Sequence, residues 1–63
     1  MKIKEFMEIL DGNHYAILLD ADSFEEIAEI DKSSDYGKYK ECDILEITVR
    51  NYDAVGLVIN DIK

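Results

Sequence analysis

The sequence has no proline and no tryptophan, and it has only one cysteine, Cys42, and one histidine, His14. A single cysteine excludes an internal disulfide. One cysteine and one histidine are also too few for a Cys/His zinc site. Small domains usually need such a link, or a partner, because they bury too little apolar surface to offset the entropy of ordering. The 63 residues fit one small domain (1–63), and we therefore expect a homo-oligomer.

Basic residues are also scarce, because seven lysines and arginines stand against 15 acidic residues and leave a net charge of −8. Proteins that follow nucleic-acid phosphates need clustered lysine and arginine, so direct nucleic-acid binding is not expected. The same charge disfavours an anionic membrane surface. No apolar run approaches the ~20 residues of a membrane span, and the charged start is unlike a signal peptide. We expect a cytoplasmic protein.

Helical periodicity is clearest near the N-terminus. Apolar residues recur there at i, i+3, i+4 and i+7, which places them on one stripe of a helix: Ile3, Phe6, Met7 and Leu10. Gly12 follows, and glycine readily takes the left-handed conformation just after a helix. The pattern predicts an amphipathic helix over residues 2–11 that is capped by Gly12.

Later segments alternate as strands do. Residues 14–20 carry apolar side chains on both faces, which predicts a strand that is covered on both sides. Residues 45–50 and 55–60 each alternate, and the turn at 51–54 between them predicts a hairpin. Residues 32–40 are polar and predict a loop or a single helical turn.

Residues 24–31 are compatible with two structures. Their apolar residues have helical spacing, and Ser23 followed by Glu26 matches a capping box. The segment is short, however, and follows a strand across a tight polar turn, which favours a hairpin partner. We prefer the strand, and the helix stays open as the alternative. The fold class that follows is α+β, with one N-terminal amphipathic helix packed on a three- or four-stranded, mainly antiparallel sheet.

The sequence contains no recognisable catalytic constellation. His14 has no serine, cysteine or aspartate companion at an identifiable spacing. Cys42 stands between Glu41 and Asp43, whose negative charge disfavours a reactive thiolate. We therefore expect a protein that is not an enzyme and has no catalytic residues.

A calcium loop is the metal site that the sequence approaches most closely. Asp20, Asp22 and Asp31 have part of the required spacing, but Glu25 stands at the sixth position, where such a loop needs glycine. No helix precedes the segment either. We expect no metal ion and no cofactor.

The acidic run between residues 20 and 35 is the strongest feature of the sequence. It holds seven carboxylates and only one lysine, and it is followed by two tyrosines, a residue type enriched in interfaces. Such a surface speeds association with a basic partner. The residues expected to bind this partner are Asp20, Asp22, Glu25, Glu26, Glu29, Asp31, Asp35, Tyr36 and Tyr39. A solvated edge that prevents aggregation between sheets explains the run equally well.

In element order and acidity the chain resembles small proteins encoded by phages and mobile elements of Gram-positive bacteria. The similarity is greatest over residues 3–12 and 43–49. Some of these proteins are anti-CRISPR inhibitors that occupy basic nucleic-acid channels of Cas effectors. The resemblance implies an inhibitor that blocks a basic surface of a Cas effector or another nucleic-acid-binding host protein. Two alternatives stay open: an oligomeric sheet protein that acts on DNA through residues 36–40, and a housekeeping protein whose acidity only gives solubility.

Overall fold

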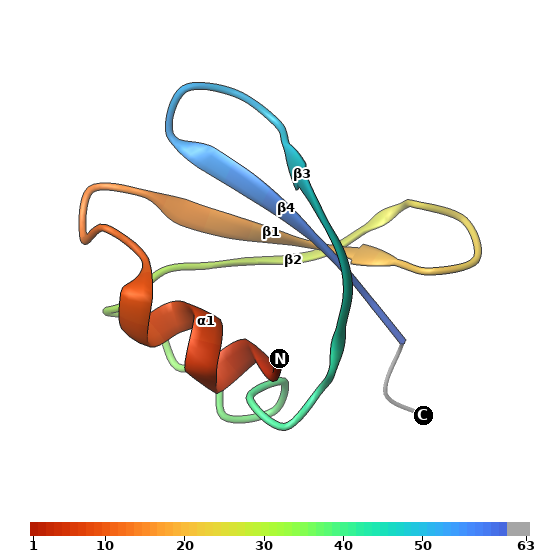
Figure 1. The fold of residues 1–63 in the computed structure, drawn as a ribbon, viewed down its shortest axis with the longest axis horizontal. Coiled ribbons are helices and arrows are strands. Elements are labelled where there is room, and N and C mark those ends of the chain that lie inside the picture. The colour runs from red at the N-terminus through yellow and green to blue at the C-terminus, as the bar shows by residue number, and fades with distance from the viewer. Residues whose placement is uncertain (61–63) are drawn as a thin grey trace.

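One helix packed on one face of a four-stranded sheet makes up residues 1–60, which are the residues that this computed structural model describes (Figure 1). The elements are α1 (Ile3–Ile9), β1 (Tyr15–Asp20), β2 (Glu26–Ile30), β3 (Ile44–Val49) and β4 (Ala54–Ile59). The strand order is β2-β1-β4-β3. The central strands β1 and β4 are parallel, and both edge strands pair antiparallel. The predicted α+β class and the mainly antiparallel sheet are confirmed.

The segment with two possible readings is a strand. Glu26–Ile30 pairs with β1 as the second half of a hairpin, and the helical alternative is wrong. The turn before it explains why. Phe24 has a φ of 59°, in the left-handed region that the first turn of a right-handed helix excludes. Its backbone N–H donates to the Asp20 carbonyl at 2.8 Å, which reverses the chain back along β1.

The helix buries the stripe that the sequence predicts, and the buried residues are Ile3, Phe6, Met7 and Leu10. They pack against Leu18 from β1 and against Leu57 and Ile59 from β4, and together these side chains form the main core. At seven residues the helix is short. No helix in residues 1–60 is long and apolar enough to cross a membrane.

The end of the helix differs from the prediction. Leu10 leaves the helix with extended backbone angles (φ −71°, ψ 135°), and its side chain still packs in the core. Asp11 then closes the turn: its carboxylate accepts the Asn13 N–H and its carbonyl accepts the His14 N–H, both at 2.9 Å. Gly12 has no positive φ, so the prediction that it caps the helix in the left-handed conformation is wrong.

A second, smaller core lies on the face of the sheet opposite α1. It consists of Ile17 and Leu19 from β1 and Ala54 and Val58 from β4. All four are buried, which confirms that β1 is covered on both sides. No helix covers this face in the described part of the chain. Side chains from the edges and turns flank it instead, among them Phe24, Thr48 and Arg50 around a hollow of about 70 Å³.

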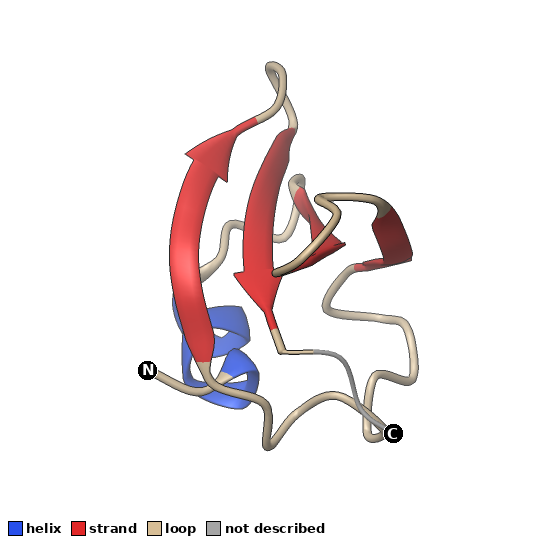
Figure 2. Cartoon of the chain, turned by 90° about the vertical axis from the view of Figure 1, so that its right-hand side faces the viewer, coloured by secondary structure: helices blue, strands red, loops and turns tan. Residues whose placement is uncertain are grey.

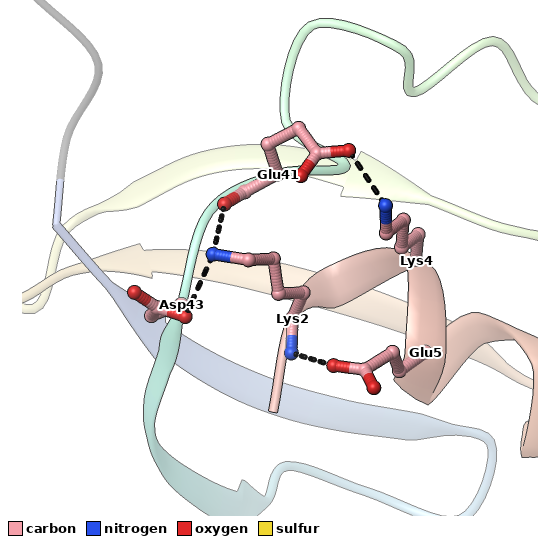
Figure 3. Close-up of polar contacts among 5 residues, drawn as sticks. All are labelled: Lys2, Lys4, Glu5, Glu41 and Asp43. Atoms are coloured by element: carbon pink, nitrogen blue, oxygen red, sulfur yellow. Dashed lines mark hydrogen bonds and ion pairs between the residues drawn. The ribbon is translucent and has the colours of Figure 1, made fainter.

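Three polar contacts join the start of the helix to the segment that leads into β3, and a fourth caps the helix (Figure 3). The Lys2 amine donates to the Asp43 carboxylate at 3.1 Å and to the Glu41 carbonyl at 3.2 Å. The Lys4 amine donates to the Glu41 carboxylate at 2.8 Å. The Lys2 backbone N–H donates to the Glu5 carboxylate at 2.7 Å, which satisfies a helix-terminal donor. Two sequence-distant segments are thereby held side by side.

The Lys4–Glu41 contact makes stability depend on pH. The hydrogen bond from Lys4 is the main reason that the pKa of Glu41 lies below its ordinary value. A carboxyl with a lowered pKa stabilises the fold above its unfolded pKa of about 4.3, and this stabilisation is lost as the pH falls through the folded value. We therefore expect Glu41→Gln to reduce the free energy of unfolding at pH 7 and to lose this effect in acid.

The measurement is urea unfolding at pH 7 and pH 3, with Glu29→Gln as the control. Glu29 is exposed, and its side chain has no hydrogen bond or ion pair within residues 1–60. Replacing Glu29 shows how much the free energy of unfolding changes when one negative charge is removed from a chain of net charge −8. Equal effects of the two substitutions at pH 7 would contradict a stabilising role for the Lys4–Glu41 contact.

A second prediction concerns Gly56 in the middle of β4. A Cβ at this position would lie 2.6 Å from Thr48 Oγ1 and 2.9 Å from Arg50 Cδ. Because threonine is stiff at χ1, we expect Gly56→Ala to destabilise the protein by about 1–3 kcal/mol through overpacking. Thermal unfolding checks this. Thr48→Ala removes the nearest atom, so Gly56→Ala should cost less in that background, and an equal cost in both backgrounds would contradict the steric explanation.

Candidate partner-binding surface

Three of the seven predicted carboxylates have a local structural role in turns. Asp20 Oδ2 accepts the backbone N–H and the hydroxyl of Ser23, at 3.2 and 3.0 Å. Asp31 Oδ1 accepts the same two groups of Ser33, at 3.0 and 2.9 Å. Asp35 accepts the backbone N–H two residues further on, at 3.1 Å. Aspartate stabilises turns in this way, so these three residues are accounted for by the fold.

The turn after β2 also fixes the charge of Asp31. The hydroxyl of Ser33 is the main cause that lowers the pKa of this carboxyl, and the backbone N–H groups of Ser33 and Ser34 add to it. Burial acts in the opposite direction and is the smaller influence. Asp31 therefore remains ionised to a lower pH than an isolated aspartate.

The other four carboxylates, Asp22, Glu25, Glu26 and Glu29, lie along one side of the molecule, and we call them the acidic edge. Asp22 and Glu25 stand in the turn between β1 and β2, and Glu26 and Glu29 belong to the edge strand β2. All four are exposed, and their side chains form no hydrogen bond or ion pair within residues 1–60. The register pairs Glu26 with Leu19 and Glu29 with Ile17, so both glutamates lie on the face opposite α1.

No basic side chain of the described residues forms an ion pair with the acidic edge. Lys32, the one lysine in the acidic run, donates from its amine to the Glu8 carbonyl near the end of α1, at 3.3 Å. Lys2 and Lys4 are engaged with the segment before β3. Within residues 1–60, no side chain of the acidic edge therefore forms an ion pair.

The two tyrosines do not join the acidic edge. Tyr36 and Tyr39 are half-buried and pack against the main core on the helix side of the sheet, whereas Glu26 and Glu29 lie on the opposite face. The Lys38 amine sits 5.7 Å from the centre of the Tyr39 ring. The structure therefore does not bring the two tyrosines together with the glutamates of β2, and their role in binding a partner stays a prediction.

A different tyrosine lies beside the carboxylates. Tyr15, at the start of β1, lines an open hollow of about 250 Å³ together with Glu29, Ile30 and Asp31. An aromatic ring and two carboxylates around one hollow suit the amine of a lysine or the guanidinium of an arginine. Sequence reasoning missed Tyr15 because it was assigned only to the strand pattern. Its position beside Glu29 depends on the β1–β2 register.

The structure does not bring the candidate metal-binding and catalytic residues together. Asp31 follows the end of β2 that is remote from Asp20 and Asp22, so the three do not surround one point. No group of three or more His, Cys, Asp or Glu side chains in residues 1–60 could hold a metal ion. His14 is half-buried, with Nδ1 4.0 Å from Asp11 Oδ1. Cys42 is half-buried against the main core.

No protein-family model, curated protein or solved structure matches this chain, and none of these comparisons points to an enzymatic activity. What the surface can do therefore follows from its geometry and charge.

Proposed function

We propose that this chain is a non-enzymatic binding protein that docks its acidic edge on a basic surface of a nucleic-acid-binding protein and so excludes nucleic acid from it. One observation carries the proposal. Asp22, Glu25, Glu26 and Glu29 are exposed on the edge strand β2 and in the turn before it, and they form no ion pair within residues 1–60. A surface of one sign attracts a surface of the other sign and orients it before contact.

The acidic edge presents the same sign of charge as a phosphate backbone. Residues along a strand rise by about 3.3 Å each, so Glu26 and Glu29 stand about 10 Å apart and offer two separate negative charges to a surface that normally holds phosphates. The strand is also an edge, so its unpaired backbone groups are available to the same partner. The phage-inhibitor resemblance is in keeping with such a target, and a Cas effector is one member of the class.

The hollow beside Tyr15 would supply the specific contact. A lysine or arginine of the partner can enter it, pair with Glu29 and lie against the Tyr15 ring. Asp31 is held ionised beside the same hollow by its bonds to Ser33. Charge along the edge would then set the rate of association, and the hollow would set the lifetime of the complex.

Direct action on DNA has less support. That alternative needs the rings of Tyr36 and Tyr39 to be free to stack on bases. Both rings are half-buried against the main core. The nearby lysines are outnumbered by carboxylates throughout the chain.

The test compares two variants with the same change in net charge. Glu26→Gln/Glu29→Gln alters the acidic edge, and Glu8→Gln/Asp53→Asn alters exposed carboxylates elsewhere. With a labelled oligoarginine peptide as the probe at low salt, we expect the edge variant to bind about tenfold more weakly, from two lost ion pairs of up to 1 kcal/mol each. The control should change binding much less, and the difference should shrink as salt is raised.

Equal losses in the two variants would mean that net charge alone is recognised, which favours the solubility explanation. The natural partner can then be sought by capture from host lysate and mass spectrometry. A true partner should be retained by the wild type and by Glu8→Gln/Asp53→Asn, be released by competing DNA, and be lost from Glu26→Gln/Glu29→Gln. Capture that is identical with all three proteins would contradict the role of the acidic edge.

A further inference from the structure

The opposite edge of the sheet, formed by β3, has a very different surface. Leu45, Ile47 and Val49 are 54%, 52% and 86% exposed. Residues 44–50 contain one acid, Glu46, and one base, and so carry no net charge within a chain of net charge −8. Figure 2 shows β3 as the outermost strand, with no element beyond it on that side and with α1 near only its lower end. An apolar, uncovered edge is a template for pairing with another strand.

We propose that two copies of this chain pair through β3 in antiparallel register and so join their sheets into one. Repulsion between two molecules of the same net charge is smallest where their surfaces are neutral. Pairing through β2 would instead bring Glu26 and Glu29 of both copies together. The charge pattern therefore selects β3 over β2 as the edge that meets a second copy.

The backbone of β3 presents its free groups at defined residues. The Arg50 N–H donates to the Ala54 carbonyl at 3.2 Å, and the register continues with Thr48 opposite Gly56. In an antiparallel ladder, alternate residues direct their backbone groups to a given neighbour. Those of Ile47 and Val49 therefore point to the open edge. Two copies can exchange these bonds when Ile47 of one stands opposite the partner's Val49.

This register also pairs the charges. It brings Thr48 onto the two-fold axis and Glu46 opposite the partner's Arg50, twice in each dimer. A shift by two residues in either direction would place Arg50 opposite Ile44 or Thr48 and lose both pairs. Arg50 forms no ion pair within residues 1–60, so its charge is unpaired there. Opposite charges on neighbouring strands stabilise their pairing.

Apolar packing and the N-terminal residues limit the contact to the same stretch. Ile47 and Val49 lie on the helix side of the sheet, opposite Leu57 and Val55, and in the dimer they form one cluster with their counterparts. Beside the start of β3 the edge is already occupied, because the Ile44 N–H donates to the Met1 carbonyl at 2.8 Å. The open stretch therefore runs over residues 45–50.

Reversing the charge of Glu46 or Arg50, alone and in mixed variants, tests the register. By sedimentation equilibrium we expect the wild type to have twice the 7.3 kDa chain mass. Glu46→Arg alone and Arg50→Glu alone each bring like charges together at both ends of the contact, so each should weaken the dimer at least about tenfold. An equimolar mixture of the two variants should restore the dimer, because every altered residue then meets its opposite. Restoration also shows that both variants are folded.

Three outcomes would overturn the proposal. The wild type could remain at 7.3 kDa at its highest soluble concentration. Either single variant could dimerise as well as the wild type. The variants could dissociate and fail to recover on mixing, which would exclude this register.

Apolar contact and backbone pairing are tested separately. Ile47→Lys should abolish the dimer, whereas Ile9→Lys, at a residue of α1 that is 72% exposed, should leave it intact. In hydrogen exchange, the amides of Ile47 and Val49 should become protected as the protein concentration rises. Protection that is independent of concentration, or that develops only when a different protein is added, would overturn the pairing of two copies.

Discussion

The parallel pairing of β1 with β4 is the contact on which the rest of the structure depends. It is in register along both strands, from Tyr15 with Ala54 to Asp20 with Ile59. Both cores are built on it, because Leu18 and Leu57 face α1 while Ile17 and Val58 face the other way. Since these two strands fill the middle of the sheet, β2 and β3 must be its edges. The position of every candidate binding surface follows from that arrangement.

The two edges solve the problem of unpaired strands in opposite ways. On β2 the glutamates repel a second copy of the same chain and attract a basic partner. On β3 the charges cancel and apolar side chains are left in water. In the proposed dimer the β3 edges would be covered, and the two acidic edges would lie at opposite ends of the joined sheet. Self-association and partner binding would then use separate surfaces and would not compete.

Periodicity in the sequence predicts which residues are buried, but it does not identify their neighbours. The stripe from Ile3 to Leu10 and the two-sided burial of β1 were predictable because the period of each element determines which side chains face the core. The parallel pairing was not, because alternation is the same for any partner strand. Gly12 was assigned a role that Asp11 performs, since the helix ends at Ile9 and the chain turns through the hydrogen bonds of Asp11.

The sequence predicts which residues carry the negative charge, but not where they lie in space. The acidic run was evident. Which of its carboxylates are free to bind was not, because three of its aspartates bond to the serines or backbone of their own turns. Asp31 followed by Ser33 is the local pattern that could have indicated this. The separation of Tyr36 and Tyr39 from the glutamates and the approach of Tyr15 to Glu29 depend on the register of strands, which a single sequence leaves open.

The central pair also affects the kinetics of folding. β1 ends at Asp20 and its parallel neighbour begins at Ala54, so the middle of the sheet closes only when a long loop of chain has been brought together. Closing such a loop costs entropy before the contacts between the strands can offset that cost. Folds dominated by distant pairings form slowly for this reason. During synthesis, α1 and the β1–β2 hairpin emerge first but must wait for β4. Until then their apolar faces are open, and the acidity of β2 would protect the unfinished chain against aggregation.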